Sequence, residues 1–218
     1  CSRIFQAVFF QLTDADGDGH VQRLSVAGRH GALTMVHAEN HDMLDWMGRR
    51  MVEGGNTAPR YHAPSRPGLA EEEAINRAIA LARLAQAPLF IVHVSTPVGA
   101  ELVANARAKG GQVWAETCPQ YLFLDYTHYE QEGFEGAKYV MTPALRERWN
   151  QDELWRGLRF GDLQSISTDH CPFCFKEQKE LGLKRTIGAL DVRNQCSGFV
   201  YAISVADQYI KTGMYKNI

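Results

Sequence analysis

"PLFIVHVSTPVGAELVANARAKGG", residues 88–111, places a short apolar run directly before a helical pattern. Residues 88–95 have the length and the β-branched content of a buried strand. Residues 96–111 follow as a capped helix that stops at two glycines. The stretch therefore predicts one strand–helix unit of an α/β domain.

The same alternation extends to both sides of this unit. Further strands are expected at residues 32–38, 112–118 and 163–168, and a weaker one at 138–142. Helices are expected from the N-cap Asn40 to the Gly54–Gly55 stop, and over residues 69–86 and 150–160. Near-continuous apolar strands between amphipathic helices indicate a parallel sheet that is covered on both faces. The fold class is therefore α/β, either an open doubly wound sheet or part of a barrel.

The composition excludes several classes of protein. The net charge of −2 gives no electrostatic footprint for nucleic acid or an anionic membrane, and no apolar run is long enough to span a bilayer. The five cysteines form no regular framework, which favours reduced thiols and a cytoplasmic location. Cys171 and Cys174 form a C-x-x-C pair, which without a second pair is interpreted as a coincidence in a loop.

Three strand ends carry side chains that bind metals. His37 lies near the end of the strand at 32–38, His93 near the end of the strand at 88–95, and Asp169 directly after the strand at 163–168. Loops at the carboxyl ends of parallel strands converge in space, and imidazole and carboxylate are ligands of catalytic zinc. Taken singly, each histidine could be a hydrogen-bonded core residue and Asp169 the N-cap of a turn. Together they favour a metal-assisted hydrolase.

Several longer stretches, from about residue 31 to residue 184, resemble the D-hydantoinase and dihydropyrimidinase branch of the amidohydrolase superfamily. The similar stretches are "GALTMVHAEN", "RPGLAEEEAINRAIALA", "PLFIVHVSTPVGAELV", "AETCPQYLFLD", "KYVMTPALRERWNQDELW" and "STDHCPF". The resemblance implies a partial (β/α)8 TIM-type barrel of the amidohydrolase kind, with about five of the eight strands present.

The resemblance also implies a reaction and a site. Members of this family open cyclic amides such as hydantoin and dihydrouracil at a two-zinc centre, and tend to be tetramers. By resemblance, His37 and His93 would bind one zinc, Asp169 would bind the other and act as the general acid and base, and the backbone at Thr142 would contact the substrate ring. Glu39, Asn40 and His170 would have supporting roles.

The chain departs from the family pattern at both ends. No H-x-H occurs in the sequence, and no lysine precedes Lys109, so neither the first histidine pair nor the carboxylated lysine that bridges the two metals is found. Arg3 stands near the place where that lysine is expected, and a guanidinium cannot form the carbamate. We therefore expect an internal piece of a hydantoinase: a divergent segment 1–30, a partial barrel domain 31–184 and a divergent segment 185–218.

Two other functions remain open at this point. "DADGDG" (14–19) begins like a calcium-binding EF-hand loop, with "IFQAVFFQL" as a possible entering helix, but Ser25 stands at the twelfth position where a bidentate Glu is needed. A weak calcium-binding module at residues 14–25 is one alternative. A non-catalytic, hydantoinase-like assembly protein that has lost metal ligands is the other.

Overall fold

The computed structural model describes residues 7–11 and 17–169 of the 218-residue chain. The chain divides into two compact units, Cys1–Thr168 and Asp169–Ile218. Of the second unit only Asp169 is described, so the fold is that of the first unit. His170, both cysteines of the C-x-x-C pair and the segment 185–218 lie outside the described residues.

A parallel sheet forms the centre of the first unit. Its strands follow one another in space in the order of the sequence, β1-β2-β3-β4-β5. Their bounds are β1 Ala7–Gln11, β2 Leu33–His37, β3 Leu89–Ile91, β4 Val113–Thr117 and β5 Ser165–Ile166. The register pairs Thr34 with Leu89 and Leu89 with Val113, so the carboxyl ends of β2, β3 and β4 lie at one edge of the sheet.

The longer helices follow the strands. They are α1 Gly17–Arg29, α2 His41–Glu53, α4 Gly68–Ala85, α5 Pro97–Ala108 and α7 Trp149–Phe160. The predicted N-cap is confirmed, because the Asn40 side chain accepts a hydrogen bond from the backbone N–H of Met43. Thr96 caps α5 in the same way, through the backbone N–H of Gly99. Shorter helical turns are η2 Pro59–Tyr61, α3 His62–Ser65, α6 Pro119–Phe123, η3 Tyr126–Glu130 and η4 Glu135–Tyr139.

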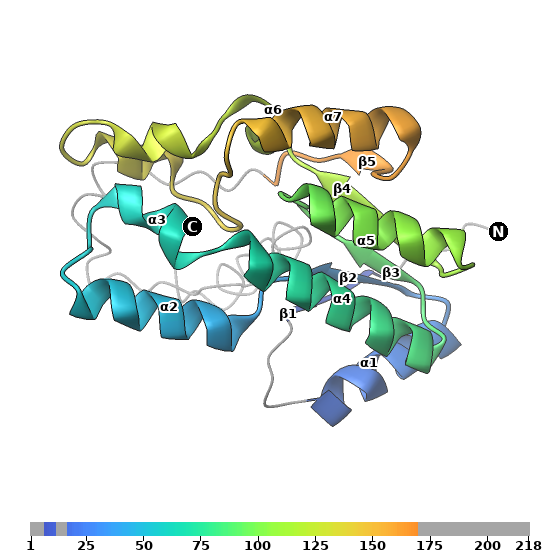
Figure 1. Cartoon of the computed structure of the whole chain (residues 1–218). Helices are drawn as coiled ribbons and strands as arrows, with labels where there is room; N and C mark the ends of the chain where they lie inside the picture. The colour runs from blue at the N-terminus through green and yellow to red at the C-terminus, as the bar shows by residue number, and fades with distance from the viewer. Residues whose placement is uncertain (1–6, 12–16, 170–218) are drawn as a thin grey trace, which may run out of the picture. The chain divides into compact units, whose positions relative to one another are not determined.

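The order of the strands decides between the two predicted arrangements. Crossovers between parallel strands are right-handed, so a sheet whose strands never reverse their order receives every crossover helix on the same face. In agreement, α1 packs on α4, α4 on α5, and α5 on α7, which makes one continuous row of helices (Figure 1). A doubly wound sheet needs a reversal of strand order, which the described strands do not have. In the described part, these helices therefore cover one face of the sheet.

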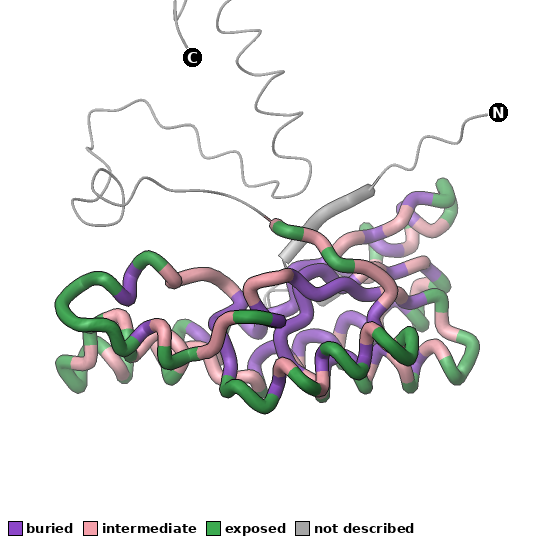
Figure 2. The backbone as a smooth tube through the Cα atoms, turned by 90° about the horizontal axis from the view of Figure 1, so that it is seen from above, coloured by how far each residue is buried: buried purple, intermediate pink, exposed green. Residues whose placement is uncertain are grey.

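Burial alternates along the strands as this one-sided cover requires. The buried residues of β2, β3 and β4 pack with the apolar faces of α4 and α5, among them Val36, Ile91 and Ala115. The residues between them, Met35 and Phe90 among others, point to the opposite face and are half-buried. Figure 2 shows the same contrast between a buried interior and exposed outer helix surfaces.

The predicted strand at 138–142 is wrong. Residues 135–139 form the 3-10 helix η4, and 140–142 continue as loop. The physical reason is that β4 already pairs with β3 on one side and with β5 on the other, which leaves no place for another strand between them. The Met141 carbonyl instead accepts a hydrogen bond from Nε2 of His62 at 2.7 Å.

The calcium-binding alternative is also wrong. Residues 17–25, which would form most of the loop, lie inside the helix α1, whose regular backbone cannot fold around a cation. The residues proposed as the entering helix include 7–11, which form strand β1 paired with β2. Residues 14–16 lie outside the described residues.

Candidate functional site

His37 and His93 lie side by side at the carboxyl edge of the sheet. Nδ1 of His37 is 2.9 Å from Nε2 of His93, and the ring centroids are 4.7 Å apart. Both side chains are buried, with 6% and 1% of their surface exposed. The structure therefore brings together two of the three residues that the sequence proposes as metal ligands, from strands 56 residues apart.

A local kink aims the His93 side chain. His93 has a φ of 44°, in the left-handed region, while its neighbours still bond to the flanking strands: the N–H of Val92 to the Val36 carbonyl and the N–H of Val94 to the Glu116 carbonyl. A residue with a β-carbon adopts this conformation at a cost of about 1–3 kcal/mol. The surrounding hydrogen bonds hold the strained residue in place, and the strain lies at the position that contacts His37.

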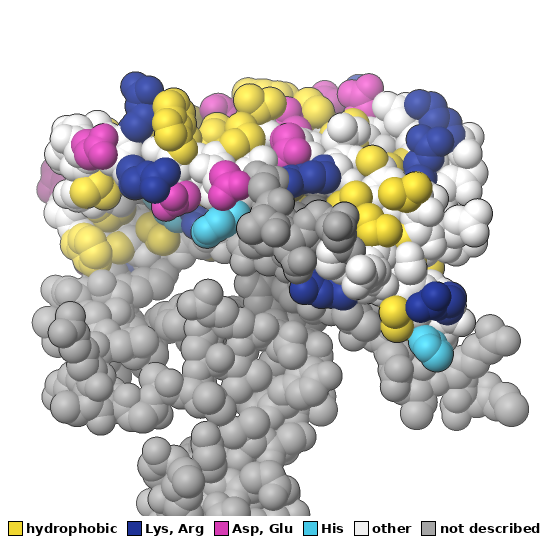
Figure 3. Space-filling model, turned by 90° about the horizontal axis from the view of Figure 1, so that it is seen from below, with side chains coloured by type: hydrophobic (Ala, Val, Ile, Leu, Met, Phe, Trp, Pro, Cys, Tyr) yellow, Lys and Arg dark blue, Asp and Glu magenta, His cyan; other side chains and the backbone are white. Residues whose placement is uncertain are grey.

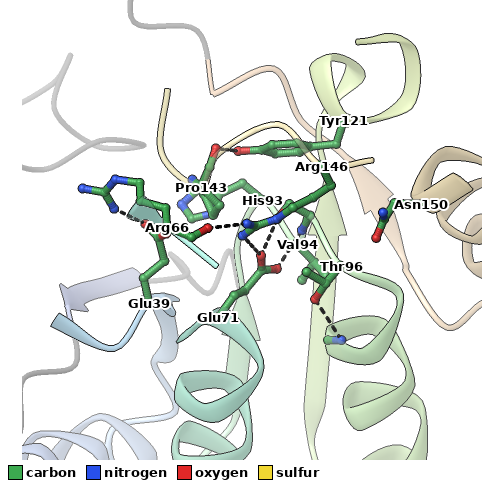
Figure 4. Close-up of polar contacts among 12 residues, drawn as sticks. Glu39, Arg66, Glu71, His93, Val94, Thr96, Tyr121, Pro143, Arg146 and Asn150 are labelled. Carbon is green, nitrogen blue, oxygen red and sulfur yellow. Dashed lines mark hydrogen bonds and ion pairs between the residues drawn. The ribbon is translucent and has the colours of Figure 1, made fainter. Parts of the chain in front are cut away.

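Glu39 and Arg66 extend the histidine pair. Nε2 of His37 donates to Oε2 of Glu39 at 3.0 Å, and Nη1 of Arg66 donates to the same oxygen at 3.0 Å. Glu39 is fully buried. The four side chains thus form one hydrogen-bonded row, His93–His37–Glu39–Arg66, of which Figure 4 shows Glu39, Arg66 and His93.

The pKa values of two side chains in this row, His93 and Glu39, are shifted. Burial, assisted by the charge of His37, lowers the pKa of His93 to about 3, so His93 is a neutral imidazole at neutral pH. Burial would raise the pKa of Glu39, but the His37 hydrogen bond and the Arg66 guanidinium outweigh it, and the pKa of Glu39 is lowered. A neutral imidazole is the form of histidine that binds a metal.

A second buried hydrogen-bond network joins Ser95, two residues after His93, to Glu71 and Arg146. Nη2 of Arg146 contacts Oε2 of Glu71 at 3.0 Å, and Nε of Arg146 donates to Oγ of Ser95 at 2.9 Å. The backbone N–H of Ser95 donates to Oε1 of Glu71 at 2.7 Å, and its hydroxyl donates to Oε2 of Glu71. Nη1 of Arg146 also donates to the Arg66 carbonyl at 2.5 Å, which connects the two networks (Figure 4).

The predicted substrate-binding residue Thr142 is half-buried in the segment between η4 and α7. Carbonyls on both sides of it are fixed: Met141 accepts from His62, and Pro143 accepts from the Tyr121 hydroxyl at 2.8 Å (Figure 4). None of the hydrogen bonds in the described part joins Thr142 to His37 or His93. Its contact with a substrate therefore stays a prediction.

Asp169 is half-buried and has a φ of 44°. It is the first residue of the second unit, and the structure does not place it relative to the two histidines. Its roles as metal ligand and as general acid and base stay predictions. Within residues 7–11 and 17–169 there is no group of three or more His, Cys, Asp or Glu side chains arranged to hold a metal ion.

The two histidines fit part of a zinc site. They supply facing ring nitrogens, and Nδ1 of His93 and Oε1 of Glu39 are buried without a hydrogen-bond partner in the described part. Buried polar atoms of native proteins normally have partners, so unpaired ones mark places where a further group is missing. The donor chemistry of this pair therefore suits zinc at two ligand positions.

Arg66, Glu71 and Arg146 were not predicted from the sequence as parts of the site. Glu71 belongs to the acidic first turn of α4, where the sequence favours interaction with the helix dipole, and it instead points inward. The surface gives no comparable signal, since acidic and basic side chains are interspersed with hydrophobic ones on the face shown in Figure 3. No helix of the described part has the length and apolarity to cross a membrane.

The chain is similar to several characterised proteins. It is 51% identical over 181 residues to the D-hydantoinase of Geobacillus stearothermophilus. This match covers 83% of the chain and 38% of that protein. It is 49% identical over 166 residues to the D-hydantoinase of Streptomyces coelicolor, covering 76% of the chain and 36% of the relative. A D-phenylhydantoinase of Escherichia coli is 41% identical over 180 residues, covering 82% of the chain and 38% of the relative.

Solved structures are also similar to most of this chain. The crystal structure of dihydropyrimidinase from Brevibacillus agri superposes with a TM-score of 0.77 at 51% identity, over 81% of this chain and 39% of that one. The L-hydantoinase of Arthrobacter aurescens gives a TM-score of 0.70 at 25% identity, over 80% and 39%. A family model of 3-oxoacyl-[acyl-carrier-protein] synthase III matches residues 190–218, which lie outside the described residues.

Proposed function

Over the part that matches, the chain belongs to the D-hydantoinase and dihydropyrimidinase family of cyclic amidohydrolases, and we propose that the protein takes part in the zinc-dependent opening of a hydantoin or dihydropyrimidine ring. The chain spans about 38% of the length of this curated relative. The observation that carries the proposal is the buried His37–His93 pair at the carboxyl ends of β2 and β3.

The proposed architecture is a sector of a (β/α)8 barrel, with five of the eight strands. Two observations support it: the parallel strands keep their sequence order across the sheet, and the crossover helices form one row along it. In such barrels the catalytic groups lie at the carboxyl ends of the strands, where His37 and His93 are found.

In the proposed site, His37, His93 and Asp169 hold zinc, which when bound polarises a carbonyl oxygen and lowers the pKa of water. His93 provides a neutral ring nitrogen, and both histidines lie in a buried setting that excludes bulk water. Asp169 accepts the proton of the attacking water and passes it to the amide nitrogen that leaves. The backbone at Thr142 orients the ring. We also propose that the protein associates as a homo-oligomer.

A non-catalytic role in assembly is the second candidate. It is considered because no H-x-H occurs and no lysine precedes Lys109 among the residues of this chain, which span about 38% of a curated relative. An H-x-H pair and a carboxylated lysine are both needed to complete the two-zinc centre that the resemblance implies. The two candidates differ in whether zinc and the buried histidines matter for turnover.

The test is a hydrolysis assay of the zinc-loaded chain with hydantoin, a 5-substituted hydantoin and dihydrouracil, with ring opening followed by loss of ultraviolet absorbance. We expect turnover that a chelator abolishes and that His93→Asn removes. His30→Asn is the matched control, because His30 is exposed, and we expect it to keep the activity. A folded chain that shows no zinc-dependent turnover above background would favour the assembly role.

A further inference from the structure

The segment 141–145, between η4 and α7, is held by side chains and not by secondary structure. In the described part, no backbone–backbone hydrogen bond involves these residues. Backbone polar groups inside a protein need partners, and here side chains of α3, α6 and η3 provide them. Nε2 of His62 bonds the Met141 carbonyl at 2.7 Å, the Tyr121 hydroxyl bonds the Pro143 carbonyl at 2.8 Å, and the Tyr129 hydroxyl accepts from the Leu145 N–H at 2.8 Å.

The bond from His62 acts on the peptide unit that carries the Thr142 N–H. The Met141 carbonyl and the Thr142 N–H belong to one planar trans peptide, so they point in opposite directions. A donor that holds the carbonyl therefore also fixes the direction of the N–H. Connected hydrogen bonds polarise one another, so the same donor makes the Thr142 N–H a stronger donor in turn.

The Thr142 N–H is left available for a ligand. Within residues 7–11 and 17–169, no hydrogen bond has it as the donor. We propose that His62 is a positioning residue, whose hydrogen bond to the Met141 carbonyl aims the Thr142 N–H at a carbonyl oxygen of the cyclic amide. The ligand rests on the proposed function, whereas the fixed peptide unit is a property of the ligand-free chain.

The His62 side chain is itself held in place. A carbonyl can only accept, so Nε2 of His62 is the donor. The imidazole meets the Tyr129 ring edge to face, with ring centroids 5.4 Å apart and an interplanar angle of 75°. Tyr129 is fully buried, and its hydroxyl accepts from the Leu145 N–H. One contacting pair, His62 and Tyr129, therefore anchors both ends of the segment 141–145.

His128 offers a matched control for His62. It is also half-buried, its Nδ1 lies 2.9 Å from the Asp125 carbonyl, and its ring centroid lies 4.9 Å from that of Tyr139. None of its hydrogen bonds in the described part reaches the segment 141–145. Replacing His128 thus removes similar contacts without touching the peptide unit of Thr142.

The first test needs neither metal nor ligand. Backbone 15N relaxation of the full chain gives the order parameter of the Thr142 amide. We expect about 0.85 in the unchanged chain and less than about 0.6 in His62→Leu, which removes the donor but keeps apolar bulk beside Tyr129. His62→Gln, which keeps a side-chain N–H donor, should restore the order, and His128→Leu should not alter it. An unchanged order parameter in His62→Leu overturns the inference, whether or not the chain binds a cyclic amide.

The second test is calorimetric titration of the metal-free chain with hydantoin. We expect His62→Leu to raise the hydantoin Kd about 2–12-fold, the range for one hydrogen bond, and His62→Gln to restore most of the affinity. His128→Leu should keep the Kd of the unchanged chain. Equal Kd values for His62→Leu and the unchanged chain overturn the inference, and so does an equal rise in His62→Leu and His128→Leu. A Thr142 amide that loosens in His62→Leu, in a chain that binds no hydantoin, supports the positioning by His62 and counts against the proposed function alone.

Discussion

The Arg146–Glu71 ion pair is buried on both sides, with side-chain exposures of 7% and 2%. Removing one member of such a pair leaves the other as an uncompensated buried charge, which costs about 3–5 kcal/mol. We therefore expect Arg146→Met, which keeps much of the side-chain volume, to lower the free energy of unfolding by about that amount. Urea denaturation followed by circular dichroism measures it.

Arg156→Met is the matched control for Arg146→Met. Arg156 pairs with Glu153 on α7, and their side chains are 64% and 36% exposed. Exposed ion pairs contribute about 0–1 kcal/mol, so this variant should change stability little. Equal losses in the two variants would contradict a special role for the buried pair.

The lowered pKa of His93 makes stability depend on pH. Between about pH 6.5 and pH 3 the unfolded chain holds a proton on His93 that the folded chain does not hold. Stability rises with pH wherever the unfolded state binds more protons, so acidification through this window removes about 1.4 kcal/mol per pH unit.

The dependence is measured by urea denaturation at several pH values. We expect His93→Gln to flatten the slope below pH 6.5, because glutamine does not titrate. His30→Gln, at an exposed position, should keep the slope of the unchanged chain. Parallel curves for the unchanged chain and His93→Gln would show that His93 takes up its proton in the folded state.

At the residue scale, the sequence identified single residues better than their partners. His37 and His93 could be proposed because each stands at the end of an apolar run, a local pattern. Arg146 and Glu71 are 75 residues apart, and nothing in either segment indicates that their side chains meet. Polar pairing across the fold has no period, so it becomes visible only once the helices and strands are placed.

At the level of elements, the close contact between α4 and α5 depends on Gly99. A β-carbon there would lie 2.8 Å from Cδ1 of Ile75 and 3.0 Å from Oγ1 of Thr96, the capping atom of α5. Gly99→Ala should lower the free energy of unfolding by about 1–3 kcal/mol through overpacking, which exceeds the gain in helix propensity of about 1 kcal/mol. Thermal and urea unfolding measure the change.

Gly48→Ala provides the opposite case. Gly48 lies inside α2, and a β-carbon added there meets nothing within 4 Å. The same substitution should therefore raise stability, by about 0.5–1 kcal/mol. If both variants were stabilised, the α4–α5 contact would be looser than the structure shows.

The elements that the sequence predicted well are those with strong local signals. Asn40 and Thr96 cap α2 and α5 where the sequence places the starts of the two helices. The segment 138–142 has strand-like composition but no free strand edge to pair with, and tertiary contacts turn it into η4 and a loop. The strand β1 was missed because "IFQAVFFQL" is mostly apolar, and a short apolar run does not distinguish a strand from a helix.

At the scale of the molecule, the alternation of strands and helices indicated a parallel α/β fold but left two topologies open. The observed topology follows from the order of the strands in the sheet. A single sequence does not contain this order, because every adjacent pair of strands is compatible with either topology. The family resemblance supplied this missing information, and the row of helices α1, α4, α5 and α7 agrees with it (Figure 1).

The first unit should unfold as one cooperative body. Among the described residues, the buried apolar cluster runs from Leu24 to Leu163, which are both in Cys1–Thr168. All four tryptophans also lie in this unit, so tryptophan fluorescence of the full chain reports on this unit alone. We expect the fluorescence-detected urea transition of a 1–168 chain to coincide with that of the full chain, and with its own transition by circular dichroism. A 1–168 chain with a broad transition, or with fluorescence and circular dichroism midpoints that differ, would show that this unit needs residues 169–218 to complete its core.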